Sequence, residues 1–324
     1  MTSYREAGVD LEAADRHVES IAAAVTGTWD GGVVGGFGGF AAGVEVPPGY
    51  RRPVLMMSTD GVGTKLDVAR QATRWDGVGF DLVAMCVDDL AAVGATPLGF
   101  VDYLAVGALD PDRDQAIVSS IAAACSAAGC PLLGGETAVH PGVMAVDAVD
   151  LAGAAMGVLE AGDELRPDRV KNEDVVIALR SPNLRSNGFS LVRALFGDDI
   201  GPHLDLLLEP SVIYAPAVLA AVATGGVHAA AHITGGGLAA NLTRALPDGL
   251  GARIDASSWE PPPHFSIVST RGVSDEEMFS TFNMGVGFCL VVDPGSREGV
   301  MQAVAEHEPW QAGSISPGQG VTLA

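Results

Sequence analysis

Apolar residues recur along this chain at two spacings, one typical of helices and one typical of strands. Spacings of three and four residues predict helices near 11–25, 77–93, 113–128, 188–196, 210–223 and 296–306, and another beginning at Gly237. Short apolar runs predict strands near 53–57, 97–106, 131–134, 149–159, 175–179, 228–233, 251–255, 284–292 and 312–316. Because strands and helices alternate in both halves, the pattern predicts an α/β (α+β) fold.

A polar stretch without a clear period, residues 161–173, separates the two halves. A length of 324 residues is ample for two ordinary domains. We therefore predict an N-terminal domain over 1–165 and a C-terminal α/β layered domain over 166–324.

The charge of the chain narrows its range of partners. Lys and Arg number 18 and Asp and Glu number 40, so the formal net charge is 18 − 40 = −22. Such a chain is repelled by nucleic acids and by anionic membranes. No apolar run reaches the roughly 18 residues that span a bilayer, the first residues are too polar for a signal peptide, and the four cysteines include no CxxC pair. These features predict a cytoplasmic protein with no nucleic-acid or membrane partner.

The motif Ser-Thr-Asp-Gly-Val-Gly-Thr-Lys at residues 58–65 directly follows a predicted strand. Glycines let the backbone approach a phosphate, because no Cβ is in the way. Asp60 could hold magnesium, and Lys65 (one of only two lysines, with Lys171) could contact phosphate oxygens. The spacing is not that of a P-loop. A second glycine-rich segment, residues 31–40, precedes this motif.

Further carboxylates could complete a magnesium site. Asp88 and Asp89 are adjacent near the C-terminal end of the helix predicted over 77–93, where negative charge is unfavourable unless something offsets it. Glu136 follows a glycine pair at the end of a predicted strand. Magnesium is typically held by one or two carboxylates together with substrate phosphates. The alternatives are a solvated acidic helix face and an ordinary turn.

Two glycine-bearing turns precede helices in the second half, and each offers free N–H groups to an anion. They are Ser186-Asn187-Gly188 and Thr234-Gly235-Gly236-Gly237. Plain helix capping is the alternative for each. Asn283, before a glycine-containing strand, could bind a ligand or only shape the turn. With no zinc spacing and no recognisable nucleophile pattern, these residues favour ATP with magnesium and a second anionic ligand.

Taken together and in order, these motifs resemble the aminoimidazole ribonucleotide synthetase family, also called phosphoribosylformylglycinamidine cyclo-ligases. The resemblance covers essentially the whole chain, and its diagnostic segments are residues 4–10, 35–40, 58–65, 81–90, 134–138, 186–188, 232–237 and 282–287. It implies an ATP-dependent ring closure in purine biosynthesis, in which ATP phosphorylates the formyl oxygen of formylglycinamidine ribonucleotide and an amidine nitrogen then displaces phosphate. It also implies a homodimer whose N-terminal domains share a β-barrel.

The resemblance assigns roles to particular residues. It implies catalytic roles for Asp60, Lys65, Asn187 and His232, and magnesium binding by Asp60, Asp89 and Glu136, with Asp88 a weaker choice. ATP contacts are implied for Gly35, Gly36, Gly38, Gly39, Asp60, Gly61, Gly63, Thr64 and Lys65. Substrate contacts are implied for Ser186, Asn187, Gly188, Thr234, Gly235, Gly236, Gly237 and Asn283.

The chain departs from the family pattern mainly on the substrate side. Many members have Asn at Asp88, Glu at Val139, His at Arg185, and basic residues at Val212 and Pro216. A related ATP-using enzyme with another substrate and a non-catalytic nucleotide-binding partner are therefore the alternatives. If Lys65 contacts ATP, Lys65→Arg should lose turnover while still folding.

Overall fold

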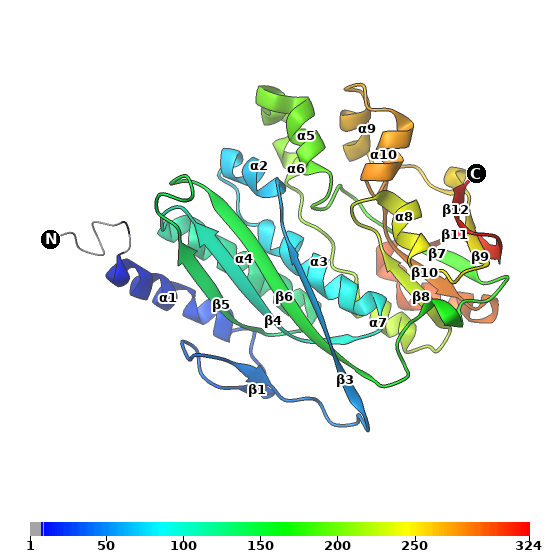
Figure 1. Ribbon diagram of the computed structural model, residues 1–324, viewed down its shortest axis with the longest axis horizontal. Coiled ribbons are helices and arrows are strands. Elements are labelled where there is room, and N and C mark those ends of the chain that lie inside the picture. Colours follow the sequence, from blue (N-terminus) through cyan, green and yellow to red (C-terminus); the bar gives the residue numbers. More distant parts are fainter. Residues whose placement is uncertain (1–7, 9) are drawn as a thin grey trace.

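The first half of the chain is built on a four-stranded sheet (Figure 1). The computed structural model describes residue 8 and residues 10–324, so most of the 4–10 segment lies outside it. The strand order is β3 (Pro53–Gly61), β6 (Val149–Glu160), β4 (Thr96–Val106) and β5 (Leu132–Val139). The pairings β3–β6 and β6–β4 are antiparallel, whereas β4–β5 is parallel. The edge strands are therefore β3 and β5.

Helices cover one face of this sheet and bury its core (Figure 1). They are α1 (Leu11–Thr26), α3 (Val78–Ala92) and α4 (Pro111–Ala128), and the short α2 (Lys65–Ala72) follows β3. Leu82 of α3, Ile121 of α4 and Phe100 of β4 are all fully buried in this layer. Asp110 caps the start of α4, and Gly129 ends it with a left-handed backbone, φ 71°.

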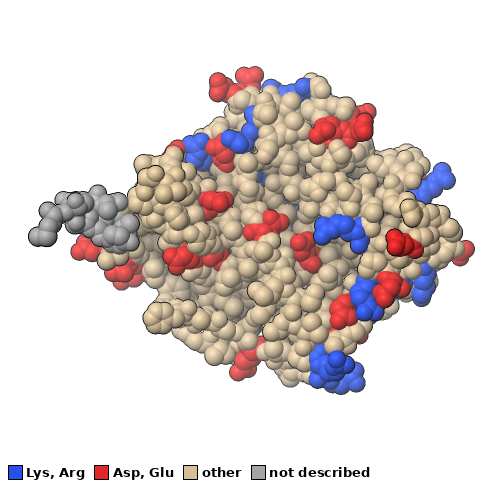
Figure 2. Space-filling view, in the orientation of Figure 1, with Lys and Arg blue, Asp and Glu red and all other residues tan. Residues whose placement is uncertain are grey.

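The opposite face of the sheet is apolar and open. Strand β3 alternates, so Leu55 and Met57 project to this side with 52% and 75% of their surface exposed. Val101 and Tyr103 of β4 are each 43% exposed. Figure 2 shows few charged side chains over the lower part of this sheet. A contiguous apolar face of this kind marks an interaction surface.

The second half is built on a six-stranded sheet with helices around it (Figure 1). Its strand order is β12 (Gly320–Leu323), β9 (Leu250–Ile254), β11 (Trp310–Pro317), β7 (Val175–Arg180), β10 (Val286–Val292) and β8 (Val227–His232). Only β12–β9 is parallel. The helices are α5 (Phe189–Phe196), α6 (Leu204–Leu207), α7 (Ala215–Val222), α8 (Gly237–Thr243), α9 (Pro263–Ser269), α10 (Asp275–Thr281) and α11 (Arg297–Ala303).

The predicted mixed α/β class and most predicted elements are confirmed, with three differences that matter for the site. Strand β3 continues to Gly61, so it includes the first half of the 58–65 motif, and β5 continues to Val139, so Gly134, Gly135 and Glu136 lie within a strand and not after one. Helix α7 begins only at Ala215, which leaves residues 208–214 irregular against the first domain. A short hairpin of β1 (Val33–Val34) and β2 (Gly43–Val44) carries the glycine-rich loop. Within the described residues, no helix is both long enough and apolar enough to cross a membrane.

Candidate active site between the domains

Helix α3 carries two adjacent carboxylates that differ completely in surroundings. Asp88 is fully buried, and its Oδ1 accepts hydrogen bonds from the backbone N–H groups of Tyr214 and Ala215 at 2.8 and 2.9 Å. Its Oδ2 pairs with Arg185 at 2.8 Å. Asp88 therefore anchors the start of α7, where a negative charge is favourable, and has no oxygen to offer a metal. The weaker magnesium assignment of Asp88 is wrong.

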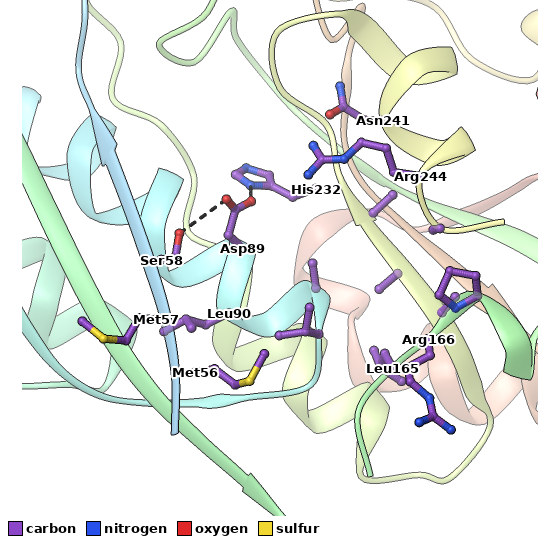
Figure 3. Close-up of a pocket in the computed structure, with 17 residues that line it drawn as sticks. Met56, Met57, Ser58, Asp89, Leu90, Leu165, Arg166, His232, Asn241 and Arg244 are labelled. Atoms are coloured by element: carbon purple, nitrogen blue, oxygen red, sulfur yellow. Dashed lines mark hydrogen bonds and ion pairs between the residues drawn. The ribbon is translucent and has the colours of Figure 1, made fainter. Parts of the chain in front are cut away.

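Asp89 instead faces the cleft between the domains, with its side chain 50% exposed. Its Oδ1 lies 2.8 Å from His232 Nδ1, and its Oδ2 lies 3.5 Å from the Ser58 hydroxyl (Figure 3). Ser58 and Asp60 share one side of β3, because alternate residues of a strand point the same way. Burial, together with the charges of Asp60 and Asp89, raises the pKa of the neighbouring Cys86 thiol to about 12. Both carboxylates therefore lie on the α3 side of β3.

The cleft itself is a cavity of about 340 Å³ lined by both halves of the chain (Figure 3). Met56, Ser58 and Asp89 line it from the first half, and His232 and Arg244 from the second. Arg244 was not among the predicted site residues, and it lies seven residues after Gly237. Seven residues are about two helical turns, so Arg244 could have been predicted on the same helix face as Gly237.

His232 does not have a free ring nitrogen. It is 5% exposed, with Nδ1 on Asp89 and Nε2 2.7 Å from a guanidinium nitrogen of Arg185. Its ring stacks on Phe288 at a centroid distance of 5.8 Å. The structure therefore places His232 in the wall of the cavity, with both ring nitrogens already bonded within the protein.

Lys65 is buried where the two halves of the chain meet. Its ammonium is buried, with 1% of the residue exposed, and forms an ion pair with Asp81 at 2.7 Å. It also donates to the backbone oxygens of Arg185 at 3.1 Å and Glu209 at 2.9 Å. All three N–H bonds of an ammonium group are thereby used. Burial lowers the pKa of Lys65 and raises that of Asp81, while the close contact between them opposes both shifts. In this arrangement Lys65 joins the two halves of the chain, and the predicted ATP contact would require its ammonium group to leave the pair with Asp81.

The other residues of the 58–65 motif lie in or next to the turn between β3 and α2. Asp60 Oδ1 accepts from the N–H of Gly61 at 2.7 Å, and Gly63 is left-handed with φ 70°. The hydroxyl of Thr64 lies 3.2 Å from that of Ser190 on α5. Asp60, Gly61, Gly63 and Thr64 thus remain available at the cleft edge, unlike Lys65.

Glu136 lies on the other edge strand of the sheet. The register runs from Asp60 through Gly153 and Asp102 to Gly135, the neighbour of Glu136. Three strand spacings of about 4.8 Å place Asp60 and Glu136 roughly 14 Å apart across the sheet. The structure does not bring Glu136 to Asp60 and Asp89 within one chain.

Glu136 instead borders a second cavity, of about 580 Å³, between α1, β5 and the glycine-rich loop. Gly36, Gly38 and Gly39 line the same cavity, and Gly35 precedes them with φ 106°. The glycine loop and Glu136, which are about a hundred residues apart in the sequence, are thus brought together.

The second cavity also contains an unusual acid. Asp102 lines it from β4, and burial raises the pKa of this carboxyl group from 3.8 to about 7. The glycine at 135 is required here, because a Cβ would lie 2.2 Å from Asp102 Oδ1. The strand pair β4–β5 therefore accommodates an acid that is neutral below neutral pH.

Asp102→Asn should stabilise the protein in a pH-dependent way. The folded-state pKa of about 7 lies above the unfolded value of 3.8. Asp102 therefore contributes fully to the stability of the fold below pH 3.8, and this contribution is lost as the pH rises to 7. The melting temperature of the variant minus that of the wild type should therefore increase from pH 4 to pH 7 and then level off. A constant difference across this range would contradict the shift.

The two glycine turns of the second half reach the cleft beside α3. The Asn187 amide lies 3.8 Å from Met85 Sδ, and a Cβ on Gly235 would lie 3.4 Å from Asn187 Oδ1, so the turns are neighbours. Gly188 and Gly237 have positive φ, 79° and 70°. A Cβ added at Gly188 would lie 2.2 Å from the Phe282 ring. One added at Gly237 would lie 2.0 Å from the backbone oxygen of Phe279. Packing as well as ligand approach therefore explains these glycines.

The remaining predicted substrate residues differ in accessibility. Gly235 and Gly236 are exposed, and Ser186, Asn187 and Thr234 are half-buried. Asn283 is 3% exposed, donates to the Asn183 oxygen at 3.0 Å and accepts from the N–H of Gly285 at 2.8 Å. Asn283 therefore shapes a turn, as the alternative interpretation has it, and its substrate contact stays a prediction.

Comparisons with known proteins match both halves of the chain. The family model described as AIR synthase related protein, N-terminal domain, matches residues 41–159, and the corresponding C-terminal domain model matches residues 171–324. The phosphoribosylformylglycinamidine cyclo-ligase of Thermosynechococcus vestitus is 45% identical over 334 residues, covering 99% of this chain and 98% of that protein. The one of Xanthomonas oryzae pv. oryzae is 42% identical over 333 residues, covering 98% of each.

Solved structures resemble the fold at lower identity. The thiamine-monophosphate kinase of Stenotrophomonas maltophilia superposes with a TM-score of 0.67 at 21% identity, covering 98% of this chain and 96% of the kinase. The hydrogenase maturation protein HypE in complex with ATP superposes with a TM-score of 0.67 at 19% identity, covering 96% of this chain and 88% of HypE. These two likenesses establish the two-domain architecture.

Proposed function

Because this chain belongs to the phosphoribosylformylglycinamidine cyclo-ligase family, we propose that it closes the imidazole ring in the cleft between its two halves. The activity is that of an ATP-dependent ligase of purine biosynthesis, which converts formylglycinamidine ribonucleotide into aminoimidazole ribonucleotide. The observation that carries the location is the convergence of Ser58 and Asp89 from the first half and of His232 and Arg244 from the second half on one cavity. We place the domain boundary at residues 165/166, in the polar segment that joins the two sheets.

We propose that Asp60 and Asp89 hold magnesium together with ATP phosphates. The donors fit the ion, because Asp89 Oδ2, the Ser58 hydroxyl and the exposed Asp60 are oxygen ligands on one side of β3. Magnesium keeps several waters and needs only one or two carboxylates besides the phosphates. When bound, the ion would neutralise phosphate charge during transfer to the formyl oxygen.

The protein's own groups would mainly position the substrate. Gly235 and Gly236 are exposed at the start of α8, where backbone N–H groups can donate to the oxygens of a phosphate. Asn187, next to this turn, can hydrogen-bond the amidine or formyl group. A formamide is a poor electrophile, so transfer of phosphate to its oxygen creates the leaving group that the attacking nitrogen displaces.

We also propose that the protein is a homodimer that pairs the open faces and edges of its four-stranded sheets. The apolar face with Leu55, Met57, Val101 and Tyr103 is what such a pairing would bury. The free edges are β3 and β5. If β3 of one protomer joins β5 of the other, Glu136 and the glycine loop of each protomer approach Asp60 of its partner. This arrangement would complete the ATP and magnesium site that a single chain leaves divided.

Met57→Asp should convert the dimer into a monomer, because it places a charge in the middle of this face. Light scattering after size-exclusion chromatography would measure the mass. Leu206→Asp, a change of an exposed apolar residue on α6 of the other half, is the matched control and should remain dimeric. A monomeric wild type, or a dimeric Met57→Asp variant, would contradict the proposed interface.

The proposed reaction is tested with purified protein, ATP, magnesium and formylglycinamidine ribonucleotide. Aminoimidazole ribonucleotide and ADP should form in equal amounts. ATP turnover only with some other acceptor would identify a related enzyme, and nucleotide binding without turnover would identify a non-catalytic partner. Val139 and Val212 are the departures that make this test necessary, since neither side chain can carry charge.

A further inference from the structure

Arg185 is a fully buried cation with an unusual backbone conformation. It lies in the loop before α5 with a left-handed conformation, φ 61°. For a residue with a side chain this conformation is unfavourable. Strain of this kind persists only where surrounding contacts stabilise it, so the side-chain contacts of Arg185 should be strong.

The guanidinium group of Arg185 connects three segments. It donates to Asp88 Oδ2 at 2.8 Å, to the Val212 oxygen at 3.1 Å and to His232 Nε2 at 2.7 Å. Its carbon lies 5.0 Å from the centre of the Tyr214 ring. A rigid planar fork is suited to this geometry, because it bonds an acid and an imidazole at the same time.

The direction of the bond to His232 follows from the chemistry of the two groups. A guanidinium has only donors, so His232 Nε2 must be the acceptor and cannot carry hydrogen. The hydrogen of a neutral imidazole then lies on Nδ1, which points at Asp89 Oδ1 across 2.8 Å. We propose that Arg185 is a positioning residue that holds His232 in the Nδ1–H tautomer and thereby orients the carboxylate of Asp89 in the cleft.

The bond to His232 determines which oxygen of Asp89 faces the cleft. With Oδ1 bonded to His232, Asp89 presents Oδ2 toward Ser58 and the cleft. The stacking of His232 on Phe288 prevents the ring from turning away. The tautomer itself stands on the geometry alone, whereas its importance for turnover rests on the proposed function of Asp89.

The test is long-range proton–nitrogen NMR of uniformly ¹⁵N-labelled protein, which reports the ring nitrogen that carries hydrogen. The chain has seven histidines, and His232→Gln identifies the relevant signals by their loss. The wild type should show hydrogen on Nδ1 of His232 and none on Nε2. Hydrogen on Nε2 would overturn the proposal whether or not the protein is an active cyclo-ligase.

The double variant Arg185→Met with Asp88→Asn tests the role of Arg185 without stranding a buried carboxylate. His232 should then populate both tautomers, and kcat should fall at least tenfold with a smaller change in KM. The matched control is Arg113→Met with Asp114→Asn, which removes another buried pair, 2.7 Å apart with side chains 8% and 0% exposed. The control should keep the tautomer and kcat of its folded fraction. An unchanged tautomer in the Arg185 variant would overturn the proposal.

Discussion

Lys65→Met is expected to lower the free energy of unfolding by about 3–5 kcal/mol, because it leaves Asp81 as an unpaired buried carboxylate. Asp81 has no exposed surface and sits 2.7 Å from the lysine. Two backbone oxygens, those of Arg185 and Glu209, also lose their donor. Urea denaturation would measure the change. Lys65→Arg should likewise be destabilised, because a larger group must enter a filled site.

The other lysine of the chain supplies the control. Lys171 is exposed, so Lys171→Met should change stability by no more than about 0.5 kcal/mol. Adding Asp81→Asn to Lys65→Met should recover much of the loss, since the amide removes the stranded charge but can still accept from Ser211, which donates to Asp81 at 2.6 Å in the wild type. A Lys65→Met variant as stable as the wild type but without turnover would instead restore the ATP contact for Lys65.

Asp89→Asn is expected to lower kcat by roughly 10²–10³-fold with an unchanged melting temperature. Its side chain is half-exposed in the cleft, so folding does not depend on its charge. Steady-state kinetics at saturating ATP and magnesium, with thermal unfolding alongside, would measure both effects.

Asp88→Asn is the matched comparison one residue away. It should lower the free energy of unfolding by about 3 kcal/mol, because Arg185 loses its buried counter-charge. The folded fraction should retain more activity than Asp89→Asn. If the two variants behaved alike, the division of Asp88 and Asp89 into a structural and a site residue would be wrong.

Most of the fold could be predicted from the sequence, since long periodic segments determine their own elements. The helices at α1, α3 and α4 and strands β4 and β6 match their predicted ranges within two residues. Strand ends could not be predicted where glycines interrupt the apolar run. Gly134 and Gly135 suggested a turn, yet they continue β5, and a Cβ at Gly135 would lie 2.2 Å from Asp102 Oδ1 on the neighbouring strand.

The sequence indicates which residue types belong to the candidate site better than it indicates how they are arranged in space. Asp89 lines the cavity between the two halves, and Asn187 lies beside both Met85 of α3 and Gly235 of the turn at 234–237. The scarcity of lysine pointed to a special role for Lys65, and the role is special, but it is a buried ion pair. Sequence spacing cannot show this, because Asp81, Arg185 and Glu209 meet Lys65 only through the packing of the two halves.

The central claim is that Asp89 holds a metal–ATP complex in the cleft between the domains, and paramagnetic NMR tests it directly. Manganese prefers the same carboxylate and phosphate oxygens as magnesium. Added with ATP, it should broaden the ring signals of His232, whose Nδ1 is 2.8 Å from Asp89, and the effect should be lost in Asp89→Asn. Manganese–ATP that binds while the His232 signals stay sharp would contradict the account.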